Sequence, residues 1–214
     1  MAVDSLIKRA KCLLLFFDSF AVLVRRDDTE TTIKQIDWSS VIRALESNYS
    51  SSWHFGELRL HKIINKGGRE TTICSLPPTF YELKFEKESI RAPLPGIVLV
   101  YTHPQMRVFA YIGRLSADST LYRCPLPNVG ELGTVCWGNL TPPKRINKAW
   151  QKFIASAFNR DFDRDKSQSH PVSVVDKLRS LTQTETSCYP ETDLIEAGFT
   201  LNSLLATLKL ETFD

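Results

Sequence analysis

The chain has 214 residues, of which 43% are hydrophobic and 24% charged, enough for one core with a smaller extension. This composition excludes a disordered chain, and only 9 glycines exclude a collagen-like or linker-dominated sequence. The net charge is +3, from 27 basic and 24 acidic residues. That excess is too small to indicate nucleic-acid binding, which concentrates many unpaired lysines and arginines on one face.

Apolar stretches near the N-terminus are too short to span a membrane. Residues 12–17 are apolar but end at Asp18, and residues 20–24 end at Arg25 and Arg26. A membrane-spanning helix needs about 20 apolar residues, and no small-residue cleavage site of a signal peptide follows. We therefore expect a soluble, cytoplasmic protein with no membrane partner.

The first fifty residues are expected to form an N-terminal extension. Residues 10–26 consist of two short apolar runs around Asp18-Ser19 and predict a β-hairpin. Residues 37–45 have the cap and apolar spacing of a short helix. Residues 1–50 are thus predicted as a hairpin-and-helix extension of the main domain.

From residue 51 the pattern changes to short alternating segments separated by turn residues. Gly67-Gly68 and several prolines mark the turns. The segments predict one antiparallel sheet that includes residues 58–60, 80–85, 97–101 and 108–112. The order lacks the alternation of strand and helix that a parallel sheet needs, so we expect an antiparallel meander within a core domain of residues 51–160.

Helices are expected to follow the meander. Residues 150–158 carry apolar side chains at helical spacing and predict a helix packed on the sheet. Residues 159–170 are charge-rich and expected to be exposed. Ser173 with Asp176 predicts another helix start, and residues 182–187 resemble a linker. A final pair of short helices, the first capped by Asp193 and Glu196 and the second with a leucine stripe at residues 201–208, completes a helical appendage at residues 161–214.

The long segment 114–145 predicts an ordered loop with a function. Its prolines remove backbone donors and its glycines allow unusual dihedral angles, and long irregular loops in compact domains are often functional. Cys136 lies on this loop, eight positions after Asn128. A thiol is a nucleophile that forms thioesters, and an amide side chain can support the loop or a developing oxyanion.

The cysteines as a set argue against disulfides and metal binding. There are five, with no Cys-x-x-Cys pair and no histidine at metal-ligand spacing. We therefore expect no metal site. No P-loop or Gly-rich dinucleotide fingerprint is present in the sequence, so we expect no organic cofactor either. Cys12 and Cys74 lie in apolar strands and are expected to be buried, and Cys124 is expected to be structural, which leaves Cys136 as the candidate nucleophile.

The order Pro127-Asn128-Val129 followed by Gly133-Thr134-Val135-Cys136 resembles the active-site signature of ubiquitin-conjugating enzymes. Residues 76–158 more specifically resemble protein B of the bacterial PRTRC systems, a prokaryotic branch of that family. The blocks that carry this closer resemblance are residues 92–96, 108–111, 120–122, 127–129, 133–136 and 156–158. The sequence departs from the family pattern at Leu126, which replaces a histidine with a mainly structural role.

The resemblance implies an α+β fold in which an antiparallel meander packs against helices. It implies that a ThiF-type activating enzyme delivers the C-terminus of a ubiquitin-like protein to Cys136, and that an amine then attacks the thioester. Asn128 would hold the oxyanion, and an acidic residue among Asp161, Asp163 and Asp165 would meet the amine or simply form a solvated charged face. The alternative is a non-catalytic module that binds the ubiquitin-like protein or the activating enzyme. A redox protein would instead need Cys124 and Cys136 within bonding distance.

Overall fold

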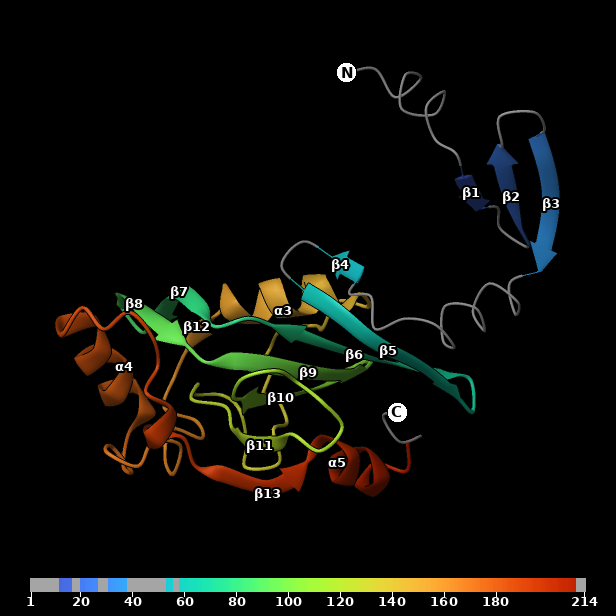
Figure 1. Ribbon diagram of the computed structural model, residues 1–214. Coiled ribbons are helices and arrows are strands. Elements are labelled where there is room, and N and C mark those ends of the chain that lie inside the picture. The colour runs from blue at the N-terminus through green and yellow to red at the C-terminus, as the bar shows by residue number, and fades with distance from the viewer. Residues whose placement is uncertain (1–11, 17–19, 27–30, 38–52, 56–57, 211–214) are drawn as a thin grey trace, which may run out of the picture. The chain divides into compact units, whose positions relative to one another are not determined.

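The computed structural model describes residues 12–16, 20–26, 31–37, 53–55 and 58–210. The chain divides into two compact units, residues 1–51 and 52–214. In the first unit, β1 (Cys12–Phe16), β2 (Phe20–Arg26) and β3 (Thr31–Asp37) form an antiparallel sheet in that order (Figure 1). The predicted hairpin is confirmed as β1–β2. The helix predicted from Asp37 onward is not present at Asp37, which ends β3, and its remainder lies outside the described residues.

The second unit is built on a seven-stranded antiparallel sheet with the order β13-β11-β10-β9-β6-β5-β4. Its strands are β4 (Trp53–Phe55), β5 (Leu58–Lys66), β6 (Arg69–Leu76), β9 (Gly96–Thr102), β10 (Gln105–Tyr111), β11 (Thr120–Arg123) and β13 (Glu196–Thr200). Antiparallel pairing throughout, with helices on its faces, gives the expected α+β class.

A second, smaller sheet corrects one prediction. β7 (Thr79–Phe85) and β8 (Glu88–Leu94) pair with each other, and β12 (Ala157–Phe158) adds a parallel strand, in the order β12-β7-β8. The expectation that residues 80–85 share one sheet with the other strands is therefore wrong. The physical reason lies in Pro77-Pro78 and Pro95, which lack backbone donors and interrupt the ladder between the two sheets.

The two sheets are nevertheless joined by one continuous ribbon. Leu76 lies opposite Ile97 in the large sheet, and Thr79 lies opposite Leu94 in the small one. The register is thus unchanged across the proline positions. β6–β7 and β8–β9 are two halves of one long hairpin that bends from one sheet into the other.

Helix α3 (Ile146–Ile154) differs in its bounds from the predicted helix at residues 150–158. It begins earlier, after Pro142-Pro143, and ends where Ser156 donates through its N–H and hydroxyl groups to the carbonyl oxygen of Phe153. Phe158 then belongs to β12, but its side chain is buried with that of Phe153 at a ring distance of 5.2 Å. The apolar spacing therefore predicted burial correctly and the end of the helix incorrectly.

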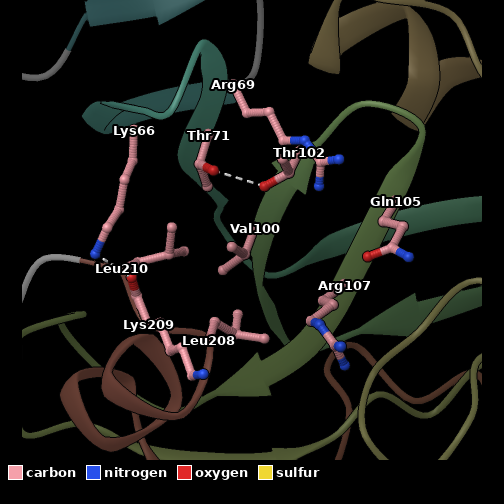
Figure 2. Close-up of a pocket in the computed structure, with 10 residues that line it drawn as sticks. All are labelled: Lys66, Arg69, Thr71, Val100, Thr102, Gln105, Arg107, Leu208, Lys209 and Leu210. Atoms are coloured by element: carbon pink, nitrogen blue, oxygen red, sulfur yellow. Dashed lines mark hydrogen bonds between the residues drawn. The ribbon is translucent and has the colours of Figure 1, made fainter.

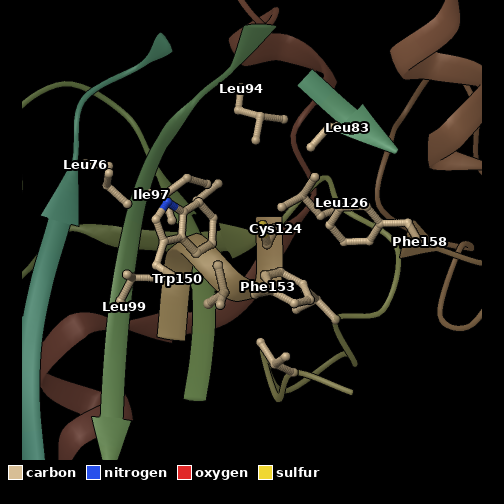
Figure 3. Packing of buried hydrophobic residues seen from close by; sticks show 14 of the residues in the cluster. Leu76, Leu83, Leu94, Ile97, Leu99, Cys124, Leu126, Trp150, Phe153 and Phe158 are labelled. Carbon is tan, nitrogen blue, oxygen red and sulfur yellow. The ribbon is translucent and has the colours of Figure 1, made fainter. Parts of the chain in front are cut away.

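The large sheet carries a hydrophobic core on each face because successive residues of a strand point to opposite sides. On the first face, Leu99 packs with Trp150 and Phe153 of α3 (Figure 3). Val108 belongs to the same core. On the second face, Val100 and neighbouring residues pack against α5 (Leu201–Thr207). The two helices thus cover opposite sides of the sheet (Figure 1).

The last fifty residues add one strand to the large sheet and apolar side chains to both cores. α4 (Val174–Gln183) is capped at its start by Ser173, whose hydroxyl accepts from Asp176 N–H as predicted. Because α4 continues through Gln183, the linker predicted from residue 182 begins later. The helix predicted at Asp193 is wrong, since η1 (Glu191–Asp193) is a single 3-10 turn and residues 196–200 form β13 against β11. The leucine-striped helix is confirmed as α5.

Among the residues that the structure describes, no helix has both the length and the apolar character required to cross a lipid bilayer.

Candidate functional site

Asn128 and Cys136 lie opposite each other at the open end of a tight hairpin. Val129 and Val135 form an antiparallel bridge, and Gly130 N–H donates to the carbonyl of Thr134 at 2.8 Å. One position further out, Cys136 N–H donates to the carbonyl of Asn128 at 2.8 Å. The eight-residue spacing noted in the sequence is therefore the register of this hairpin, which brings the predicted nucleophile and the predicted amide together.

The hairpin is anchored on the part of β10 that β11 leaves uncovered. β11 pairs only with Phe109 and Ala110, while Arg107 forms an antiparallel bridge with Thr134. Val108 N–H donates to the carbonyl of Gly133 at 2.8 Å, and Val135 N–H donates to the carbonyl of Met106 at 2.9 Å. The segment leading to Cys136 is thus held as a short extra strand of the large sheet.

Gly133 is required at this contact. Its φ of +72° is a conformation that side chains disfavour. A Cβ atom at this position would lie 2.6 Å from the ring of Phe109 and 2.9 Å from the carbonyl oxygen of Val108. Only glycine lets the hairpin approach β10 this closely.

Asn128 adopts a left-handed conformation, with φ +61°, and its side chain is paired with Asn159. Its Nδ2 donates to Asn159 Oδ1 at 2.9 Å, and Asn159 N–H donates to Asn128 Oδ1 at 3.0 Å. Asn128 N–H also donates to the carbonyl of Asp161 at 2.7 Å. Asn159 was not predicted from the sequence, where its only signal is its place directly after the apolar segment that ends at Phe158.

The three aspartates singled out from the sequence have different environments. Asp161 is exposed and bonded to Asn159, accepting from Nδ2 at 2.9 Å. Asp163 is only 5% exposed and accepts from Ser173 Oγ and from the N–H of Val175. Asp165 is exposed and follows that buried position. The expectation that residues 159–170 are exposed is therefore wrong at Asp163, which caps the start of α4.

Lys166 is a second exception, and it holds the loop of Asn128 in place. Its side chain is 3% exposed, and Nζ donates to the carbonyl oxygens of Leu126 and Val129, on either side of Asn128. Burial lowers the pKa of this amine to about 8, and nearby Arg123 acts in the same direction. A charge-rich segment gave no signal in the sequence that one of its lysines faces inward.

The described cysteines fall into two groups. Cys74 and Cys124 are buried, and burial raises the pKa of each thiol to about 12. Cys124 lies in the core beside Leu126 (Figure 3), so the expectation that it is structural is confirmed. Cys136 is partly exposed and Cys188 exposed, and all four thiols are free. The side chain of Cys12 lies outside the described residues.

The chain after Cys136 is also held against α3 and the first face of the large sheet. Trp137 packs its ring against Phe153 at a centroid distance of 6.0 Å. Tyr101 donates its hydroxyl to the carbonyl of Pro143, and Lys152 Nζ donates to the carbonyl of Thr141 at 3.1 Å. Ordered segments therefore support Cys136 from both directions along the chain.

Comparison with protein-family models matches residues 40–197 to prokaryotic E2 family D, where E2 denotes a ubiquitin-conjugating enzyme. The match includes the strands from β4 to β12, the start of β13, α3, α4 and the hairpin of Cys136, and it covers well over half of the chain. The chain is accordingly an E2-like protein of prokaryotic type. It belongs to prokaryotic E2 family D.

This membership confirms the resemblance to prokaryotic ubiquitin-conjugating enzymes, and it indicates a ubiquitin-conjugating type of role with ubiquitin-like and activating proteins as general partners. The closer resemblance to PRTRC protein B stays a prediction. Neither the search of curated proteins nor the search of solved structures gave a match.

Proposed function

We propose that the chain carries a ubiquitin-like protein as a thioester on Cys136 and transfers it to an amine. The observation that carries this proposal is the hairpin register, in which the N–H of Cys136 bonds to the carbonyl of Asn128. It combines a partly exposed thiol with a rigidly held amide residue, an arrangement suited to acyl transfer.

In the first step, the thiolate of Cys136 attacks the thioester carbonyl that joins the modifier's C-terminal glycine to the activating enzyme. A new C–S bond forms to Cys136, the old C–S bond breaks, and the activating enzyme's thiolate leaves. The proton lost from Cys136 goes to solvent, from which the departing thiolate takes one. Exchange between two thioesters is nearly isoenergetic, so the site needs positioning more than a strong driving force.

In the second step, a neutral amine nitrogen attacks the Cys136 thioester and a C–N bond forms. The C–S bond breaks, Cys136 leaves as a thiolate, and the nitrogen loses one proton to solvent. Asn128 Nδ2 has two hydrogens, and the bond to Asn159 uses one of them. We assign the second N–H to the oxyanion that develops at the carbonyl. The bond to Asn159 would fix the orientation of this donor.

Asp161 is the aspartate we assign to the incoming lysine. Its backbone carbonyl accepts from Asn128, its side chain is exposed, and it bonds to Asn159. An exposed carboxylate beside the reacting thioester would attract and orient a lysine ammonium. Asp163 is unsuited to this role because its carboxylate is buried and accepts two hydrogen bonds at the start of α4.

The experiment is a reconstituted transfer reaction with the cognate activating enzyme, ATP and modifier. Wild type should form an adduct that a thiol reductant cleaves. Cys136→Ser should form a reductant-resistant ester, and Cys136→Ala should form none. Cys188→Ser is the matched control, because Cys188 is the other exposed thiol among the described residues, and this variant should behave as wild type.

Two outcomes would overturn the proposal. A reductant-sensitive adduct on Cys136→Ala would place the nucleophile elsewhere. Binding of the activating enzyme with no adduct on wild type would favour the non-catalytic module.

A further inference from the structure

A basic pocket lies on the second face of the large sheet, beyond the end of α5. Its volume is about 330 Å³, at the lower end of the range typical of small-molecule sites. The lining residues are Lys66, Arg69, Thr71, Val100, Thr102, Gln105, Arg107, Leu208, Lys209 and Leu210. The set contains four basic side chains and no carboxylate. Figure 2 shows Val100 on the floor with the basic side chains around it.

Strand register explains why these residues meet. Lys66 lies opposite Arg69, Thr71 opposite Thr102, and Arg107 opposite Val100. Opposed residues of neighbouring strands share a face, so β5, β6, β9 and β10 together form the floor. The hydroxyls of Thr71 and Thr102 are 2.6 Å apart and mutually bonded (Figure 2).

The positive charge of the pocket is not neutralised within the part of the chain that the structure describes. None of the four basic side chains forms an ion pair with a described carboxylate. Their hydrogen bonds go to neutral groups, Lys66 to the carbonyl of Lys209 and Arg107 to Leu132 and Thr134. Glu70, between Arg69 and Thr71, belongs to the opposite face by strand alternation. Like charges held together repel one another, and a bound anion would relieve that repulsion.

The form of the pocket favours a small phosphate ligand over an acidic peptide. An extended peptide usually gains affinity by pairing with a free strand edge. The central floor strands β6 and β9 have neighbours on both sides, whereas β4 pairs with β5 only as far as Leu60. The centre of the floor therefore offers no such edge, and recognition there depends on side chains. Guanidinium and ammonium groups bind phosphate oxygens through charge-assisted hydrogen bonds. Val100, Leu208 and Leu210 add apolar surface for an organic group.

We propose that this pocket binds a small molecule carrying a di- or triphosphate group. The inference goes beyond the proposed function, because no step of thioester transfer uses the pocket. The shared ligand chemistry is the polyphosphate, which free pyrophosphate and a nucleotide both supply.

The test is isothermal titration calorimetry of the full chain at low ionic strength with pyrophosphate, ADP and tetraglutamate as probes. Arg69→Gln combined with Lys209→Gln removes two exposed charges from the pocket. Arg107 is left in place because it also holds the hairpin of Cys136. The matched control combines Lys87→Gln with Arg114→Gln, two exposed residues outside the pocket with the same total charge change.

We expect wild type and control to bind pyrophosphate and ADP, and the pocket variant to bind both at least tenfold more weakly. Tighter binding of ADP than of pyrophosphate would indicate that the apolar side chains of Val100, Leu208 and Leu210 contact the organic group. Equal binding of the two would indicate that the pocket recognises the phosphates alone. The proposal is overturned by absence of phosphate binding, by equal weakening in the control variant, or by pocket-dependent binding of tetraglutamate alone. Unchanged thermal unfolding of both variants shows that the folds are intact.

Discussion

Replacing Lys166 with methionine should change how stability depends on pH. The substitution keeps a long side chain but removes the amine that donates to Leu126 and Val129. Leaving a buried carbonyl without a donor costs about 1–3 kcal/mol, or about 4 kcal/mol for the two together. This loss is partly offset because methionine, unlike the charged lysine, has no charge that folding must remove from water.

The pKa shift gives the size of that opposing effect. The pKa of Lys166 falls from 10.5 to about 8 on folding, a shift worth roughly 3 kcal/mol when the amine is charged. Between these two values the unfolded chain binds more protons than the folded one, so wild-type stability rises as pH increases through 8. Integrating this term from pH 7 to pH 9 gives a gain of about 1 kcal/mol. The variant lacks this gain.

Lys166→Met should therefore be less stable than wild type by about 1 kcal/mol at pH 7 and by about 2 kcal/mol at pH 9. Urea unfolding at pH 7, 8 and 9 measures both free energies. Lys144→Met, which removes an exposed lysine, is the matched control for the loss of one lysine. Lys166 lowers the pKa of the buried Cys124 thiol, but burial raises that pKa to about 12. The thiol therefore stays protonated in all three folded proteins up to pH 9, and its contribution to the comparison cancels. If the free energy of unfolding of Lys166→Met differs from that of wild type by the same amount at pH 7, 8 and 9, the reasoning is refuted.

The remaining predictions concern packing, catalysis and the hairpin. Phe153→Ala should lower the free energy of unfolding by about 3–5 kcal/mol because the ring is fully buried; an unchanged melting curve would contradict the helix-on-sheet packing. Asn128→Gly, which keeps the positive φ, should slow aminolysis on the order of 10–1000-fold and slow loading of Cys136 less. Asn159→Ala, which loosens the loop, should slow both half-reactions equally. Equal losses in Asn128→Gly would therefore indicate that Asn128 has a structural role alone. Gly133→Ala should destabilise by about 2–4 kcal/mol through clash and strain, and adding Phe109→Leu should restore part of that loss in thermal unfolding.

Strands and buried residues could be predicted from the sequence, since both follow from local patterns. Residues 97–101 and 108–112 alternate or are uniformly apolar, and they form β9 and β10 nearly as expected. Sheet membership of residues 80–85 could not be predicted in the same way. It depends on how the prolines at 77, 78 and 95 divide the ladder, and alternation alone does not reveal that.

The two central residues of the candidate site were predicted from the sequence, whereas the residues that hold them in place were not. Asn128 and Cys136 stand out because of their motif and spacing. Asn159 and Lys166 lie more than 30 positions after Asn128 in the chain. They bond to Asn128 and to its neighbours Leu126 and Val129 only through tertiary structure. A lysine in a charged segment gives no local sign of burial, because burial is decided by the elements that cover it.

The unchanged register of the long hairpin has a consequence for the order of folding. From the turn at Glu86, each residue pair of β7–β8 and then of β6–β9 can add next to one already formed, out to Thr71 and Thr102. Such a ladder extends without closing a new large loop. β13, by contrast, joins β11 by pairing Thr120 with Thr200, a separation that makes nucleation slow. Pulse-labelled hydrogen exchange should therefore show the amides of β6 and β9 protected before those of β13, so that the ribbon forms a template on which the C-terminal strand docks last.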